Sequence, residues 1–141
     1  MLGTKETNTK RDDTALFASL IKDAASSPES RKIIVPKLIK IAENVKEIDI
    51  NIHLPVTQYN ECSFLHLSAL FGSQELVSAL LLRGALWNAV DCNLKSVGDY
   101  CLESGNKDLY NYLVEEGTRT ELLLAALNDY QNEDEYEDDN Q

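Results

Sequence analysis

The chain of 141 residues is long enough for one domain with a modest core, and its 43% hydrophobic and 26% charged residues are typical of a globular protein. The formal net charge of −11 disfavours direct binding to nucleic acid and favours a basic protein partner, and no apolar run reaches the roughly 18 residues of a membrane span. The amino terminus lacks the apolar stretch of a secretory signal, and we expect the three cysteines to be reduced, in the cytoplasm or the nucleus.

The first half of the chain predicts two helices after a disordered amino terminus, residues 1–13. Apolar residues recur at helical spacing after Thr14, which is a suitable cap for the first helix. The sequence "SSPES", residues 26–30, is a turn signal. Residues 31–51 then predict a second helix with Pro36 near its start, where proline costs least.

The middle of the chain repeats itself with a period of 33 residues, which indicates stacked helix pairs. Ser63 is placed to cap the first helix of such a pair, and glycines are placed to end both helices with a positive φ. The residues related by this period are His66 and Asp99, Gly72 and Gly105, Gly84 and Gly117, Val77 and Tyr110, Leu80 and Leu113, and Leu81 and Val114.

The end of the chain predicts one more helix and a tail. The sequence "TRTELLLAALNDY", residues 118–130, has Leu122, Leu123 and Ala126 available to cover the last helix pair as a capping helix. The last residues, 131–141, are dominated by Asp and Glu, which predicts a disordered acidic tail. Capture of basic partners by this tail is the alternative.

The residues Ser63-Phe64-Leu65-His66, followed by Gly72 and Gly84-Ala85, resemble an ankyrin repeat, whose signature is Thr-Pro-Leu-His-x-Ala. The resemblance implies an all-α fold, a short ankyrin-repeat solenoid of about three helix pairs plus a C-terminal capping helix, over residues 14–130. It also implies that His66 bridges neighbouring loops as a scaffold residue. The finger that connects the first two units, "HLPVTQYNEC", is four residues longer than the next one.

A narrower resemblance covers Gly84 to Leu127, with "GALWNAVD" and "GTRTELLL" as its most specific parts. This segment is similar to the N-terminal ankyrin region of fungal protein arginine N-delta-methyltransferases. In those enzymes a domain that binds S-adenosylmethionine follows, but this sequence has no G-x-G-x-x-G motif after a strand. The resemblance therefore implies a scaffold without methyl-transfer chemistry.

Catalytic and metal sites have weak support in the sequence. Ser63 and Cys62 lie close to His66, but the repeat itself accounts for this spacing and no third group is evident. Cys62 and His66 are four residues apart, yet neither Cys92 nor Cys101 belongs to a C-x-x-C pair. We expect no enzyme activity, no metal and no cofactor.

The predicted interaction surface follows the finger tips and the exposed face of the first helices, as in ankyrin proteins. Leu70 and Phe71 either contact a partner or lie covered by the long first finger, and Trp87 either anchors a partner or staples two repeats together. The partner-binding candidates are Tyr59, Asn60, Cys62, Leu70, Phe71, Trp87, Cys92, Asn93, Lys95, Glu103 and Ser104.

These features predict a monomeric, non-enzymatic ankyrin-repeat protein that mediates protein–protein interaction with a basic partner and does not bind nucleic acid or membranes. Two alternatives stay open. One is a regulatory or substrate-recruiting module related to arginine methyltransferases. The other, based on charge alone, is a dedicated chaperone of a basic ribosomal or chromatin protein.

Overall fold

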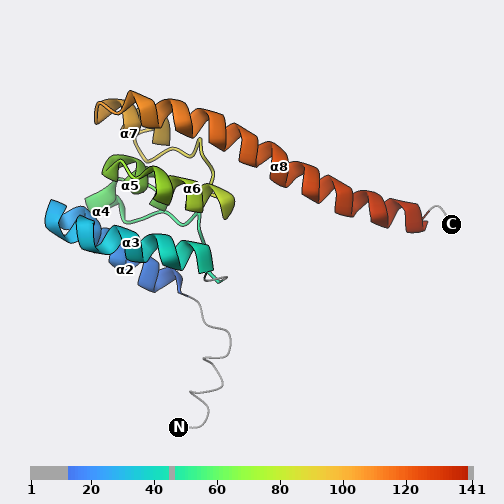
Figure 1. Ribbon diagram of the computed structural model, residues 1–141, viewed down its shortest axis with the longest axis horizontal. Coiled ribbons are helices and arrows are strands. Elements are labelled where there is room, and N and C mark those ends of the chain that lie inside the picture. Colours follow the sequence, from blue (N-terminus) through green and yellow to red (C-terminus); the bar gives the residue numbers. More distant parts are fainter. Residues whose placement is uncertain (1–12, 45–46, 140–141) are drawn as a thin grey trace, which may run out of the picture.

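The structure is a computed structural model that describes residues 13–44 and 47–139, with side chains as far as Tyr130. This part of the chain is all-helical and has no strand, which confirms the all-α part of the predicted fold class (Figure 1). Residues 1–12 of the predicted disordered amino terminus lie outside the described residues, as do residues 140–141. The helices are α2 (Thr14–Ser26), α3 (Pro28–Asn44), α4 (Val56–Tyr59), α5 (Phe64–Phe71), α6 (Gln74–Leu82), α7 (Val97–Glu103) and α8 (Lys107–Asp139).

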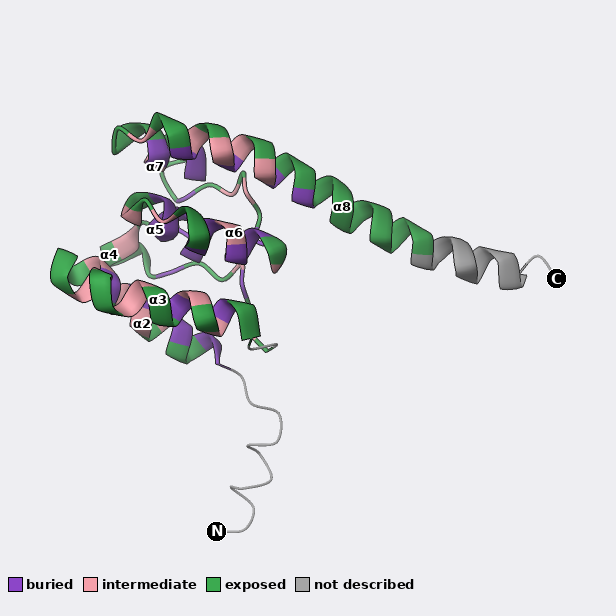
Figure 2. Cartoon of the chain, in the orientation of Figure 1, coloured by how far each residue is buried: buried purple, intermediate pink, exposed green. Residues whose placement is uncertain are grey.

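The six longer helices form three antiparallel pairs that stack in one direction, namely α2 with α3, α5 with α6, and α7 with α8 (Figure 1). The middle pair contacts both neighbours, because α5 touches α2 and α7 while α6 touches α3 and α8. The shared core follows these contacts, and the rings of Phe17 and Phe64 are 4.9 Å apart where the first two pairs meet. Burial is densest in the middle pair, which is covered on both sides (Figure 2).

The period of 33 residues reappears in the hydrogen bonds of the helix ends. Ser63 and Ser96 each begin a first helix with a reciprocal capping box, in which a side chain three residues on bonds back to the cap. Gly72 and Gly105 follow these helices with φ values of 76° and 74°, a region that favours glycine. The sequence therefore places both first helices and the turns after them correctly.

The first pair differs from its prediction at both helix starts. Thr14 does not cap α2, because its Oγ1 accepts a hydrogen bond of 2.7 Å from the backbone N–H of Asp49. The break before α3 is only Ser27, whose Oγ accepts from the N–H of Ser30, so "SSPES" supplies the first turn of a helix. Pro28 is the first residue of α3, and Pro36 lies inside this helix instead of near its start.

The last pair corrects the prediction for Gly117 and for a separate capping helix. Gly117 does not end a helix but lies within α8, which runs without interruption from Lys107 to Asp139. Leu122, Leu123 and Ala126 do not cover the last helix pair, because all three are exposed on the part of α8 that projects from the body (Figure 2). The same helix continues into residues 131–139, where the sequence predicts a disordered tail.

Candidate functional site

Two loops at one edge of the stack form the site, and we call them the first finger (residues 53–62) and the second finger (residues 89–95). Each closes with an isolated antiparallel bridge, between His53 and Ser63 in the first finger and between Val90 and Ser96 in the second. The backbone N–H of Cys92 donates a 2.7 Å hydrogen bond to the carbonyl of Asn60. This bond joins the two fingers into one surface.

Asp91 organises the second finger and attaches it to α7. Its Oδ1 accepts hydrogen bonds of 2.9 Å from the backbone N–H groups of Asn93 and Lys95, and its Oδ2 accepts one of 2.6 Å from the hydroxyl of Tyr100. Burial acts to raise the pKa of Asp91, but these three hydrogen bonds outweigh it and lower that pKa. The second finger is thus held in one shape by an ionised carboxylate.

His66 fixes the base of the same finger from below. Its Nδ1 accepts from the backbone N–H of Ser63 at 3.1 Å, so Nε2 carries the proton and donates to the carbonyl of Lys95 at 3.1 Å. The ring of His66 is fully buried and meets the ring of Tyr100 edge-on, with centroids 4.6 Å apart. His66 therefore bridges two loops, as the sequence predicts for a scaffold residue.

A groove of about 390 Å³ lies between the fingers and α7, and we call it the finger groove. Its rim carries an ion pair between Lys95 Nζ and Glu103 Oε2 at 2.6 Å, which is half exposed and so contributes little to folding. Leu70 is 45% exposed and supplies its apolar contact surface. The lining residues are Asn60, Leu70, Asp91, Asn93, Lys95, Tyr100, Glu103 and Ser104. Six of these are among the predicted partner-binding residues.

The alternatives for Leu70 and Phe71 are resolved differently for each residue. Leu70 is exposed in the finger groove and is not covered by the first finger. Phe71 is half-buried, and the guanidinium of Arg31 from α3 lies 4.8 Å above its ring. Phe71 thus packs against the first helix pair and does not line the groove.

Three other predicted residues also do not line the finger groove. The prediction that Cys62 contacts a partner is wrong, because this residue is 1% exposed and belongs to the core at the base of the first finger. Tyr59 is half-buried against the same core, on the short helix α4. Cys92 is exposed on the second finger beside the groove lining.

Trp87 has the geometry of a staple between the second helix pair and α8. Its Nε1–H donates to Glu121 Oε1 at 2.7 Å, and its indole lies so close to Gly117 that a Cβ there would be 2.5 Å from Trp87 Cγ. Gly117 is therefore required by a packing contact and not by a turn. Trp87 does not line the finger groove.

Leu94 at the tip of the second finger is a surface residue that sequence reasoning missed. It is 79% exposed and has a φ of 64°, a conformation that costs free energy in a leucine. The signal was an apolar residue in the otherwise polar turn "DCNLKS". An exposed apolar side chain held in a strained turn is typical of a contact residue.

The reactive side chains near the site have structural uses. Ser63 Oγ lies 2.9 Å from His66 Nδ1, but both residues are buried and the serine caps α5. Burial, with a contribution from Asp91, raises the pKa of Cys62 to about 11, which keeps the thiol protonated and poorly nucleophilic. Among the described side chains, no group of three or more His, Cys, Asp or Glu is placed to hold a metal ion.

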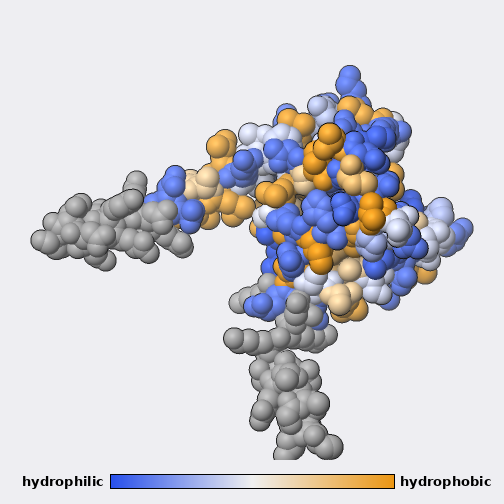
Figure 3. All heavy atoms as spheres, turned by 180° about the vertical axis from the view of Figure 1, so that it is seen from behind, coloured by the Kyte–Doolittle hydropathy of each residue, from blue (hydrophilic) through white to orange (hydrophobic). Residues whose placement is uncertain are grey.

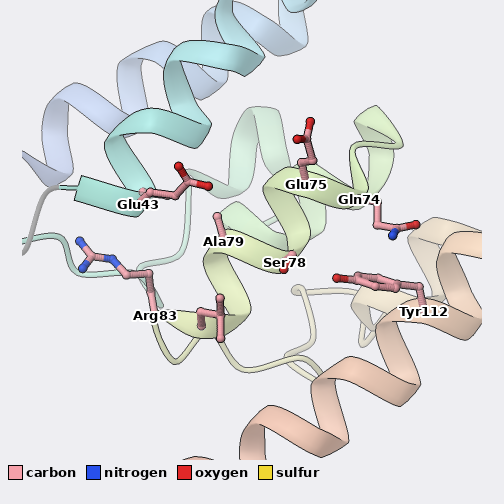
Figure 4. A pocket seen from close by; sticks show the side chains of 9 residues that line it. Glu43, Gln74, Glu75, Ser78, Ala79, Arg83 and Tyr112 are labelled. Carbon is pink, nitrogen blue, oxygen red and sulfur yellow. The ribbon is translucent and has the colours of Figure 1, made fainter.

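A second hollow, of about 470 Å³, lies on the other side of the stack between α3, α6 and α8 (Figure 4). Glu43, Glu75 and Tyr112 reach toward it from three different helices. Arg83 also lines it, and its Nη2 is buried with no hydrogen-bond partner among the described residues. An atom without accessible surface cannot contact a ligand, so this orphan donor does not make the hollow an anion site.

None of the described helices combines the length and the apolar character that crossing a bilayer requires. No family model matches the chain, and no solved structure matches it.

Fungal enzymes named protein arginine N-methyltransferase 2 match part of the chain, in their N-terminal region. The enzyme of Gibberella zeae is 42% identical over 59 residues, which are 42% of this chain and 13% of the enzyme. That of Aspergillus oryzae is 43% identical over 63 residues, or 45% of this chain and 14% of the enzyme. That of Cryptococcus neoformans is 37% identical over 64 residues, or 45% and 18%. The matched segment thus spans 18% or less of each of these three curated relatives.

Proposed function

We propose that this chain is a non-enzymatic ankyrin-repeat module that binds a basic protein through the finger groove. The observation that carries the proposal is the convergence of two fingers and α7 on one preformed surface, whose lining includes six of the residues that the ankyrin resemblance predicts for partner binding. The stacked helix pairs and the repeated capping boxes support the ankyrin assignment.

Rigidity and charge favour protein binding at this groove. Asp91 and His66 hold the second finger by hydrogen bonds to its backbone, so a partner meets a surface that is already ordered. Leu70 and Leu94 offer apolar contacts, and the net charge of −11 attracts a basic partner over a longer range.

A matched pair of variants tests the proposal after affinity capture of partners at low salt. Asn93→Arg places a bulky cation in the groove, while Asn111→Arg makes the same change on the exposed surface of α8. We expect Asn93→Arg to reduce recovery of the partner about tenfold or more and Asn111→Arg to leave it unchanged. Equal recovery with both variants would contradict the proposal, and a stepwise salt series measures the share due to charge.

The partial match to arginine methyltransferases favours a second candidate, a regulatory or substrate-recruiting module. The relatives are named for methylation of protein arginine, so a module that recruits arginine-rich protein to such an enzyme would need an acidic surface of this kind. This candidate predicts that the captured partner is an arginine-rich protein or a methyltransferase. Mass spectrometry of the captured material distinguishes the two candidates.

The non-enzymatic character has its own test. Calorimetric titration of the chain with S-adenosylmethionine should give no binding heat, since the stacked helix pairs offer no glycine-rich turn from a strand to a helix. Saturable binding would contradict this part of the proposal and leave the groove experiment unaffected.

A further inference from the structure

The projecting part of α8 continues the same helix face that packs on the body. Leu109, Leu113, Gly117 and Thr120 follow one another at intervals of three or four residues and are all buried. Leu124 and Leu127 continue this spacing, but they are 40% and 55% exposed. The apolar stripe therefore extends past the body that it packs against.

The apolar stripe on α8 adjoins a hollow at the corner where α8 leaves the body. A hollow of about 110 Å³ lies there, lined by Leu86 and Trp87 from the loop after α6 and by Thr120 and Leu124 from α8. Leu86 is 57% exposed. Apolar residues gather on α8 at this corner, between the body and the grey end of the helix (Figure 3). We define the α8 stripe as Leu86, Leu123, Leu124 and Leu127.

Charge decides what can cover the α8 stripe. The sequence from Glu121 to Asp139 contains many acidic residues and no lysine or arginine. A second copy of this chain would bring another such segment against the first, and like charges at this distance repel. A basic segment would be attracted, and a helix fits the straight, regularly spaced face that α8 presents.

We propose that the α8 stripe is a second docking surface, which binds an amphipathic helix of a partner protein with leucine-like residues on one face and Lys or Arg on its flanks. The helix lies along α8, with one end in the corner beside Leu86 and Trp87. Its apolar face covers the stripe, while its basic flanks pair with the carboxylates of α8. This surface is separate from the finger groove, so the inference does not depend on the proposed function.

The test uses the full chain and a fluorescent 18-residue peptide of Leu and Lys, with Leu at helical spacing. A peptide of the same composition, reordered so that it has no apolar helical face, is the control for charge. The double variant Leu123→Gln/Leu127→Gln, called the stripe variant, removes two of the four leucines of the α8 stripe without a loss of helix propensity. Leu16→Gln/Leu102→Gln removes two comparably exposed leucines elsewhere.

Fluorescence anisotropy should show that the stripe variant binds the patterned peptide about tenfold more weakly than the wild type, while the control variant binds normally. The reordered peptide should bind weakly to all three proteins. Equal binding of both peptides, or normal binding by the stripe variant, would overturn the proposal. Loss of binding in Asn93→Arg would place the peptide in the finger groove and would also overturn it. Sedimentation equilibrium should show a monomer, and a dimer that the stripe variant abolishes would assign the stripe to self-association instead.

Discussion

The second and third helix pairs, α5–α6 and α7–α8, share a serine capping box and a positive-φ glycine after the first helix, and they differ at their ends. Each begins with a serine capping box, but the residue that completes the box is the buried His66 in one pair and the exposed Asp99 in the other. Beyond the last turn, the chain leaves α6 at a glycine with φ of 93°, Gly84, whereas α8 passes through the related Gly117.

The repeat period thus determines the local backbone geometry, whereas the surrounding residues determine the role of each side chain. His66 has the second finger above it and so donates a further hydrogen bond to Lys95, whereas no such hydrogen bond is seen for Asp99, which keeps only the capping role among the described contacts. Likewise Gly84 makes a turn, but Gly117 makes room for Trp87. The same position can thus have a different function in each pair.

The two residues that complete the capping boxes should differ most in their contribution to stability, and His66 should contribute more than any other residue compared below. His66→Ala should lower the free energy of unfolding by about 3 kcal/mol, because it leaves the buried backbone N–H of Ser63 without its partner, removes the hydrogen bond to the Lys95 carbonyl and opens a cavity. Asp99→Ala should cost only about 1 kcal/mol, the usual value of an exposed cap. Urea denaturation measures both, and similar costs would show that the second finger does not depend on His66.

The two glycines give the next comparison. Gly117→Ala gains helix propensity of about 1 kcal/mol, yet the new Cβ would displace Trp87 and break its bond to Glu121, so we expect a net loss of about 1–2 kcal/mol. Gly84→Ala has open space around its Cβ and should cost about 1 kcal/mol through its positive φ alone.

Trp87 distinguishes these two mechanisms. It is the single tryptophan of the chain, so its fluorescence should change in Gly117→Ala and stay as it is in Gly84→Ala. In a Trp87→Ala background, Gly117→Ala should become neutral or stabilising. Additive effects of the two substitutions would contradict the staple.

The pH dependence of stability compares two groups that hold the second finger, His66 and Asp91. Burial lowers the pKa of His66 below 6.5, so the unfolded chain binds a proton first, and stability should fall as the pH drops below about 6.5 until the folded-state pKa is passed. The pKa of Asp91 is also lowered, from 3.8, so its contribution is present above that pH and is lost in a separate, more acidic window.

Variants of His66 and Asp91 show which group causes the loss of stability in each of these two pH ranges. His66→Asn should remove the loss of stability just below pH 6.5, and Asp91→Asn should remove only part of the loss below pH 4. Thermal unfolding followed by circular dichroism across this range checks both. An unchanged profile in His66→Asn would show that another group titrates there.

The sequence predicts the parts of this molecule that local chemistry determines. Ser63, Gly72 and the period of 33 residues place α5, α6 and α7, and the resemblance to ankyrin repeats predicts six of the residues that line the finger groove. Burial of a side chain by residues that are far away in the sequence is harder to predict. The sequence predicts Cys62 as an exposed finger residue, but it is buried where the first finger joins the core. The sequence also places Pro36 near the start of a helix, but it lies inside α3.

The main error in the predicted fold is the turn that the sequence places at Gly117. A glycine at the end of a helical pattern favours a turn, and nothing in the local sequence shows that an indole from residue 87 will approach Gly117. Leu94 is not among the predicted contact residues, although its side chain is the most exposed of the large apolar residues described.

Deletions at the projecting end of α8 should change the free energy of unfolding least. They test where the packed part of the third helix pair ends. Among the side chains of α8 that the structure describes, which end at Tyr130, Thr120 is the last buried one, and every side chain from Glu121 to Tyr130 is exposed. Deletion of residues 131–141 should therefore change the free energy of unfolding by no more than about 0.5 kcal/mol. Deletion from Gly117 onward should lower the free energy of unfolding more, because it removes the surface of α8 on which Trp87 packs and the hydrogen-bonded Thr120. If the shorter deletion destabilised the body as much as the longer one, the end of α8 would have to fold back onto the helix pairs, and the exposed α8 stripe would not exist.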